Sequence, residues 1–172
     1  MPKACDAVMI TSLLAAIGLA ATAAPGSAAQ LVSTHKDWIS FLHEADGEKL
    51  CFITSEPKDK QPANARRDPV HFYISTWTKA GVTAEVSIKL GFPVKKGTDV
   101  LIKIDGQQWR LFGEGERAFM ANAGDELKLI EAMRKGTRLT VEATSERGTK
   151  VVDTYSLAGL AQGLQALADA CR

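Results

Sequence analysis

An alternation of apolar and polar side chains constrains the fold of this chain more than any other feature. Between residues 83 and 90 every second residue is apolar and the residues between them are polar. A repeat of two places alternate side chains on opposite faces of a β-strand, so that one face is buried and the other meets solvent. The same repeat recurs at 69–77, 100–104 and 137–144. The chain is therefore predicted to be mostly β.

Turn-forming dipeptides divide this pattern into hairpins. Asp46-Gly47 and Asp105-Gly106 each separate two short apolar segments. An Asp-Gly pair in that position is typical of a tight β-hairpin, because both residues tolerate positive φ. About eight strands are expected in all. They are predicted at 38–42, 49–55, 69–77, 83–90, 100–104, 107–112, 137–144 and 149–155.

Two segments change to a helical repeat. Residues 125–135 begin with acidic residues, end with basic ones and are followed by Gly136, which is a usual stop signal. Residues 156–171 carry an apolar stripe at three-and-four spacing, with Ser156 as the expected N-cap. The predicted fold is a mostly β, jelly-roll-like β-sandwich with two helices, one of them C-terminal. The helices are expected to cover an edge or an open end.

Length and composition favour one folded domain without a nucleic-acid surface. The chain has 172 residues, of which 45% are apolar and 24% charged, enough for a single domain with a real core. Its formal net charge is +1, whereas nucleic-acid surfaces usually show as basic domains or stripes. Residues 30–172 are predicted to form a single β-sandwich domain, and no nucleic acid is expected as a partner.

Residues 1–29 have the layout of a secretory signal. Lys3 supplies a positive start, residues 7–24 form an apolar stretch, and small residues follow where a signal peptidase reads. Cleavage is predicted after Ala29, with Ala24 as the second choice. A membrane anchor is the competing interpretation, because a spanning helix needs ~20 predominantly apolar residues. Cleavage is favoured because the stretch is dominated by alanine and ends in Pro-Gly. We predict a periplasmic, cell-surface or secreted protein with no stable membrane span after signal removal.

Export changes how the cysteines are interpreted. Cys5 would leave with the signal, so Cys51 and Cys171 remain. Two thiols in an oxidising compartment tend to pair. Cys51 lies in a predicted strand, and Cys171 lies on the buried stripe of the last predicted helix. We predict a disulfide between them that holds this helix against the first hairpin, with two separate buried thiols as the alternative.

Several short motifs follow one another between about residues 37 and 171. They are Asp37-Trp38, Cys51, Glu85-Val86-Ser87-Ile88, Gly91-Phe92-Pro93, Lys96-Gly97, Ala132-Met133-Arg134-Lys135-Gly136, Ser145-Glu146-Arg147-Gly148-Thr149 and Asp153-Thr154-Tyr155-Ser156-Leu157-Ala158-Gly159. In this order they resemble the invasion-associated locus B (IalB) family of exported alphaproteobacterial proteins. The resemblance implies a signal peptide, a periplasmic or surface location, a β-sandwich and a disulfide. The family name implies a link to host-cell entry, and the family has no agreed catalytic residues to carry over.

The residues themselves show no catalytic, metal or cofactor motif. The only histidines are His35, His43 and His71. They lack the close spacing of metal ligands, which favours exposed strand histidines. No serine lies in a nucleophile-elbow pattern. Residues 113–116 are glycine-rich, but they lack the lysine and the spacing of a phosphate-binding loop and are interpreted as a turn. We predict no enzyme activity, no metal and no cofactor.

Charged segments supply the candidate binding residues. The stretch 56–68 contains two prolines and several charges without periodicity, and it is predicted to be the one long loop. The candidates are Arg66, Arg67, Arg147 and Tyr155. A structural interpretation stands beside each of them: a solvated loop, a buried Asp153–Arg147 pair across a hairpin, and core packing of Tyr155.

These observations favour a non-enzymatic periplasmic or surface binding protein that presents the 56–68 loop to an envelope or host-surface partner. The alternative is an envelope hydrolase acting on glycan or cell-wall material, which predicts a deep pocket lined by paired carboxylates or a histidine. A third interpretation is a folding helper or inhibitor of another envelope protein.

Overall fold

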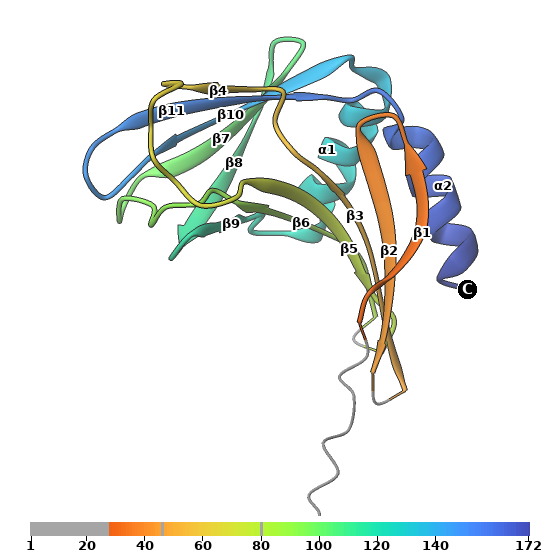
Figure 1. Ribbon diagram of the computed structural model, residues 1–172. Coiled ribbons are helices and arrows are strands. Elements are labelled where there is room, and N and C mark those ends of the chain that lie inside the picture. The colour runs from red at the N-terminus through yellow and green to blue at the C-terminus, as the bar shows by residue number, and fades with distance from the viewer. Residues whose placement is uncertain (1–27, 46, 80) are drawn as a thin grey trace, which may run out of the picture.

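The computed structural model describes residues 28–45, 47–79 and 81–172 (Figure 1). Eleven strands and two helices lie within these residues. The strands are β1 (Gln30–His35), β2 (Trp38–Ala45), β3 (Glu48–Ser55), β4 (Asp59–Gln61), β5 (His71–Trp77), β6 (Val82–Lys89), β7 (Asp99–Ile104), β8 (Gln107–Glu114), β9 (Arg117–Phe119), β10 (Arg138–Thr144) and β11 (Lys150–Ser156). The helices are α1 (Ala123–Lys135) and α2 (Leu160–Ala170).

The strands form one antiparallel sheet that folds back on itself. Its order is β1-β2-β3-β5-β6-β9-β8-β7-β10-β11-β4. Tyr155 on β11 nevertheless packs edge-on against Phe72 on β5, with ring centroids 5.7 Å apart, although these strands are far apart in the sheet order. Two layers of one curved sheet therefore face each other (Figure 1). The prediction of a mostly β, sandwich-like fold is confirmed.

The core lies between the two layers and follows the predicted alternation. Val86, Ile88 and Leu90 are fully buried, as are Val100 and Ile102. On β10, which pairs with β7, Leu139 and Val141 are fully buried as well. Each inward side chain removes apolar surface from water, which is the main favourable term in folding.

Helix α1 begins two residues before the predicted start. The Asn122 side chain accepts a hydrogen bond from the Asp125 backbone N–H and caps the helix. On the buried side of α1, Glu126 Oε1 accepts a hydrogen bond of 2.9 Å from the Val86 backbone N–H, which joins the helix to β6. Burial raises the pKa of the Glu126 carboxyl.

Helix α2 begins at Leu160, so the prediction of a helix from Ser156 with Ser156 as N-cap is wrong. Ser156 is the last residue of β11 and pairs with Arg138. Gly159 is the observed N-cap, with a φ of 92°. A Cβ at Gly159 would lie 1.9 Å from the His35 carbonyl oxygen, so this tight corner requires glycine.

The strands β1, β4 and β9 were not among those predicted. Strand β4 lies within the predicted 56–68 loop and pairs with β11, where Lys60 lies opposite Asp153. All three residues of β4 are exposed, so the segment has no buried face that would produce an alternation. Residues 59–61 form a strand because their backbone pairs with β11.

The predicted signal, residues 1–29, lies outside the described residues except for its last two positions. Over the described part of the chain, no helix has the length and apolar character that spanning a membrane requires.

Candidate functional site

A hollow of about 790 Å³ opens where three distant segments meet, and Glu116, from the turn between β8 and β9, lines it as well. Residues 62–68 come from the predicted loop, 91–93 follow β6, and 145–151 include the turn between β10 and β11. We call this site the arginine hollow. Its lining is Pro62, Asn64, Ala65, Arg66, Arg67, Asp68, Gly91, Phe92, Pro93, Glu116, Ser145, Glu146, Arg147, Thr149 and Val151.

Backbone hydrogen bonds hold the three segments together. The Asp68 N–H donates to the Gly91 carbonyl at 3.0 Å, and the Glu146 N–H donates to the Pro93 carbonyl at 2.9 Å. Gly91 has a φ of 73°, and a Cβ there would lie 2.2 Å from the Asp68 carbonyl oxygen. Glycine at this position therefore lets the 62–68 segment approach closely.

Arg67 forms a buried ion pair beneath the hollow. Its Nη1 donates to Asp153 Oδ2 at 2.8 Å, and its Nη2 donates to Asp153 Oδ1. The side chains are only 5% and 0% exposed, respectively. Burial raises the pKa of the Asp153 carboxyl, and the bonds from Arg67 oppose that rise. The guanidinium is thus engaged within the protein.

The structure corrects the suggested Asp153–Arg147 pair. Asp153 points inward from β11 and meets Arg67, which is far away in the sequence. Arg147 is exposed in the turn between β10 and β11. The error arose because the prediction paired Asp153 with the nearest arginine across the hairpin, whereas the inward face of β11 points toward the other layer.

Arg66 and Arg147 are exposed and line the hollow from different segments. Three carboxylates line it as well: Asp68, Glu116 and Glu146. Phe92 is half-buried, and its ring centroid lies 6.0 Å from the Arg67 guanidinium carbon. The hollow therefore offers charged groups of both signs beside a partly apolar floor.

Tyr155 does not lie on a ligand surface. Its side chain is fully buried and packs against Phe72, and it is absent from the lining of the hollow. Of its two interpretations, core packing is the correct one. The alternation of β11 explains this outcome, since Val151, Asp153 and Tyr155 all face inward.

Two other predicted features take structural roles. Lys58, in the predicted loop, forms an ion pair with Asp37. Residues 115–116 join β8 to β9, and Glu114 lies opposite Arg117, so the turn predicted within 113–116 is confirmed. No group of three or more His, Cys, Asp or Glu side chains able to hold a metal ion lies within the described segments.

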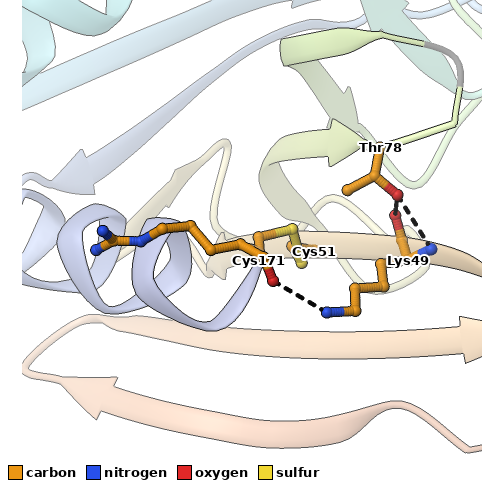
Figure 2. The surroundings of a disulfide bond; sticks show 5 residues. Lys49, Cys51, Thr78 and Cys171 are labelled. Atoms are coloured by element: carbon orange, nitrogen blue, oxygen red, sulfur yellow. Dashed lines mark hydrogen bonds between the residues drawn. A yellow bond between two sulfur atoms is a disulfide. The ribbon is translucent and has the colours of Figure 1, made fainter.

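The predicted Cys51–Cys171 pair forms a disulfide in the structure, with the two Cα atoms 6.1 Å apart. Figure 2 shows that the bridge joins the end of α2 to β3. Lys49, on the same strand, donates from Nζ to the Arg172 carbonyl at 3.2 Å. The C-terminus is thus attached to β3 at two neighbouring points.

The buried Arg67–Asp153 pair is the feature that sequence reasoning missed. A signal was available on one side only: Asp153 occupies an apolar position in the alternation between Val151 and Tyr155. A carboxylate at such a position predicts a buried partner. Nothing in the local pattern of residues 62–68 identified Arg67 as that partner.

A solved structure and a protein family are similar to this chain. A crystal structure described as invasion associated protein b from Bartonella henselae is similar, with a TM-score of 0.59 and 16% sequence identity, covering 82% of this chain and 98% of that one. No curated protein matches the sequence. The family described as Invasion associated locus B (IalB) protein matches residues 38–168. This match spans most of the described domain, and the chain belongs to the invasion-associated locus B family.

Proposed function

We propose that this chain is exported and that residues 30–172 form a non-enzymatic binding module of the envelope or cell surface, with the arginine hollow as its contact site. One observation carries the proposal. Three segments far apart in the sequence converge on this hollow, and two of them, 91–93 and 145–149, are among the motifs that carry the family resemblance. The third contains Arg66, from the charged loop.

The architecture of the hollow suits a binding role. The Arg67–Asp153 pair and the Asp68–Gly91 hydrogen bond hold its base in one arrangement. Above that base, Arg66 and Arg147 are free to reorient toward a ligand because both are exposed. Binding sites are commonly loops positioned by a rigid scaffold, and a few polar groups beside apolar surface are their usual composition.

Two features support export. Strand β1 begins at Gln30, directly after the proposed cleavage at Ala29, so cleavage there leaves every described strand intact. The Cys51–Cys171 disulfide fits an oxidising compartment. The name of the Bartonella henselae protein is the reason to include host-cell surfaces among the candidate partners.

Charge reversal in the hollow tests the proposal. The immobilised protein is exposed to periplasmic and host-membrane extracts, and captured material is identified for wild type and for Arg66→Glu/Arg147→Glu. Capture should fall at least tenfold in the double variant, since both exposed guanidinium groups are reversed. The matched control is Arg138→Glu, because Arg138 is exposed but lies outside the hollow. Equal capture by all three proteins would remove the hollow as the contact site.

The hydrolase alternative rests on the three carboxylates that line the hollow, Asp68, Glu116 and Glu146. It predicts that the wild type releases soluble fragments from purified cell wall and that Glu116→Gln/Glu146→Gln does not. Such a result would overturn the binding module in favour of an enzyme.

A further inference from the structure

A second groove, of about 490 Å³, lies on the outer face of the layer that contains β2, β3 and β5. Its floor contains Phe41 on β2, Phe52 on β3 and Tyr73 on β5. Phe52 lies between Cys51 and Ile53, which are fully buried, so Phe52 must face the other way. Helix α2 packs on the buried side, where Gly163 meets Ile53. The aromatic side of these strands therefore faces solvent.

The three rings form a continuous row across the strands. Phe41 and Phe52 are stacked, with centroids 5.2 Å apart and 21° between their planes. Phe52 and Tyr73 follow at 6.1 Å. Ile39, 37% exposed, extends the apolar floor. At the Tyr73 end, the Arg117 guanidinium carbon lies 5.6 Å from the ring centroid and bounds the row.

The rim of the groove is polar and balanced in charge. Lys36 and Lys58 are offset by Asp37 and Glu56, and Lys58 is paired with Asp37. Such a rim favours neither an anionic nor a cationic ligand.

Two buried polar atoms belong to residues that line the same groove. Thr54 Oγ1 and His71 Nδ1 are buried and have no hydrogen-bond partner among the described residues. His71 Nδ1 lies 4.0 Å from Glu56 Oε1, beyond hydrogen-bonding distance. Pairing either atom with a ligand hydroxyl group requires that its side chain turn toward the groove.

The three strands that carry the aromatic row have no free edge. Strands β2, β3 and β5 are internal to the sheet, and each is paired on both sides. An extended peptide gains affinity by adding to a free strand edge, which these three strands do not offer, whereas β1, which contributes Thr34 to the lining, is an edge strand. An occupant of the aromatic row itself therefore lies flat on side chains.

We infer that this groove binds a neutral oligosaccharide. Sugar rings present apolar C–H faces that pack on aromatic rings, and their hydroxyls both donate and accept hydrogen bonds. That combination matches a row of aromatic rings inside a charge-balanced polar rim. The site is separate from the arginine hollow and goes beyond the proposed function, because the two linings share no residue.

Calorimetric titration with defined probes tests the inference. The probes are neutral oligomers of N-acetylglucosamine, cello-oligosaccharides and malto-oligosaccharides of two to six units. Wild type should bind at least one series, with affinity unchanged by added salt because the ligand is neutral. Phe52→Thr should weaken binding at least tenfold, since threonine suits a strand but removes the central ring. Far-ultraviolet circular dichroism and thermal unfolding establish that this variant is folded.

Two controls separate this site from other surfaces. Phe112→Thr removes another exposed ring, 48% exposed and outside the groove, and should bind like wild type. Arg66→Glu/Arg147→Glu should also bind the sugar normally; loss in that variant would place the sugar in the arginine hollow and overturn this inference alone. Absence of binding to all three series would overturn it too. So would dimerisation or vesicle binding that Phe52→Thr abolishes in a protein that binds no sugar.

Discussion

At the scale of single residues, one buried ion pair decides where the 62–68 segment lies. Asp153 is fully buried on β11, and Arg67 reaches it with two hydrogen bonds. A buried charge without a partner is strongly unfavourable, whereas a paired one is close to neutral relative to apolar residues. The pair therefore selects one loop position rather than adding much net stability.

Removing either partner should destabilise the fold, and removing both should restore most of the loss. Arg67→Met or Asp153→Leu is expected to lower the free energy of unfolding by about 3–5 kcal/mol, because one charge stays buried without its partner. Arg67→Met/Asp153→Leu should come close to wild type. Urea denaturation at pH 7 measures all four proteins, and additive losses in the double variant would contradict this account.

The Arg67→Met variant should also respond to pH. Without Arg67, burial is the largest remaining influence on Asp153, opposed by the charge of Lys60, and the pKa of its carboxyl rises further above the unfolded value. Folding then disfavours the carboxylate, so stability is lost as pH rises above the unfolded pKa and is regained as pH falls toward it. The difference in unfolding free energy between wild type and Arg67→Met, measured by urea denaturation, should therefore become smaller as the pH is lowered.

At the scale of elements, Gly163 determines how closely α2 packs against β3. Gly163 lies over Ile53, and the Ser40 hydroxyl donates to the Gly163 carbonyl at 3.2 Å. A Cβ at this position would lie 2.3 Å from Ile53 Cδ1. Helix propensity alone would favour alanine, so packing against the fully buried Ile53 explains the glycine here.

Gly163→Ala should therefore destabilise the protein by about 1–3 kcal/mol, since overpacking a filled core outweighs the gain in helix propensity. Gly124→Ala in α1 is the matched control, because its Cβ would meet only Asn122 Oδ1, at an ordinary 3.5 Å. That variant should be neutral or more stable by up to ~1 kcal/mol. Thermal unfolding compares the two, and a stabilising Gly163→Ala would show that α2 can shift away from Ile53 freely.

At the scale of the whole molecule, the disulfide constrains nearly the entire domain. It joins residues separated by 120 positions, and so it links β3, near the start of the fold, to Cys171, the C-cap of α2. Cross-linking so long a loop reduces the entropy of the unfolded chain by an amount worth ~5 kcal/mol in the chain-entropy model. The free energy of unfolding of a typical domain is about 5–15 kcal/mol in total, so the bridge contributes a large share of the stability.

Cys51→Ala/Cys171→Ala should accordingly lose about 2–5 kcal/mol of unfolding free energy, measured by urea denaturation. Thiol labelling without reductant gives a second measurement. In a Cys5→Ser background, which removes the third cysteine from the count, the native protein should take up no label. One labelled cysteine in the folded protein would contradict the bridge.

The sequence by itself determined the local features of this protein. Alternation predicted the strands at 83–90, 100–104 and 137–144, because a period of two is a property of neighbouring residues. The stripe of α2 and the presence of two cysteines after the predicted signal led to the prediction of the bridge between Cys51 and Cys171. The ordered motifs led to the family.

Only the tertiary structure decided which distant residues meet. The strand β4 exists because β11 is beside it, and Arg67 is a structural residue because Asp153 faces it across the interior. The row Phe41–Phe52–Tyr73 forms because β2, β3 and β5 are adjacent in the sheet. The physical reason is that periodicity records which face of an element is buried, whereas contacts between elements depend on how a sheet folds back on itself, which no local pattern contains.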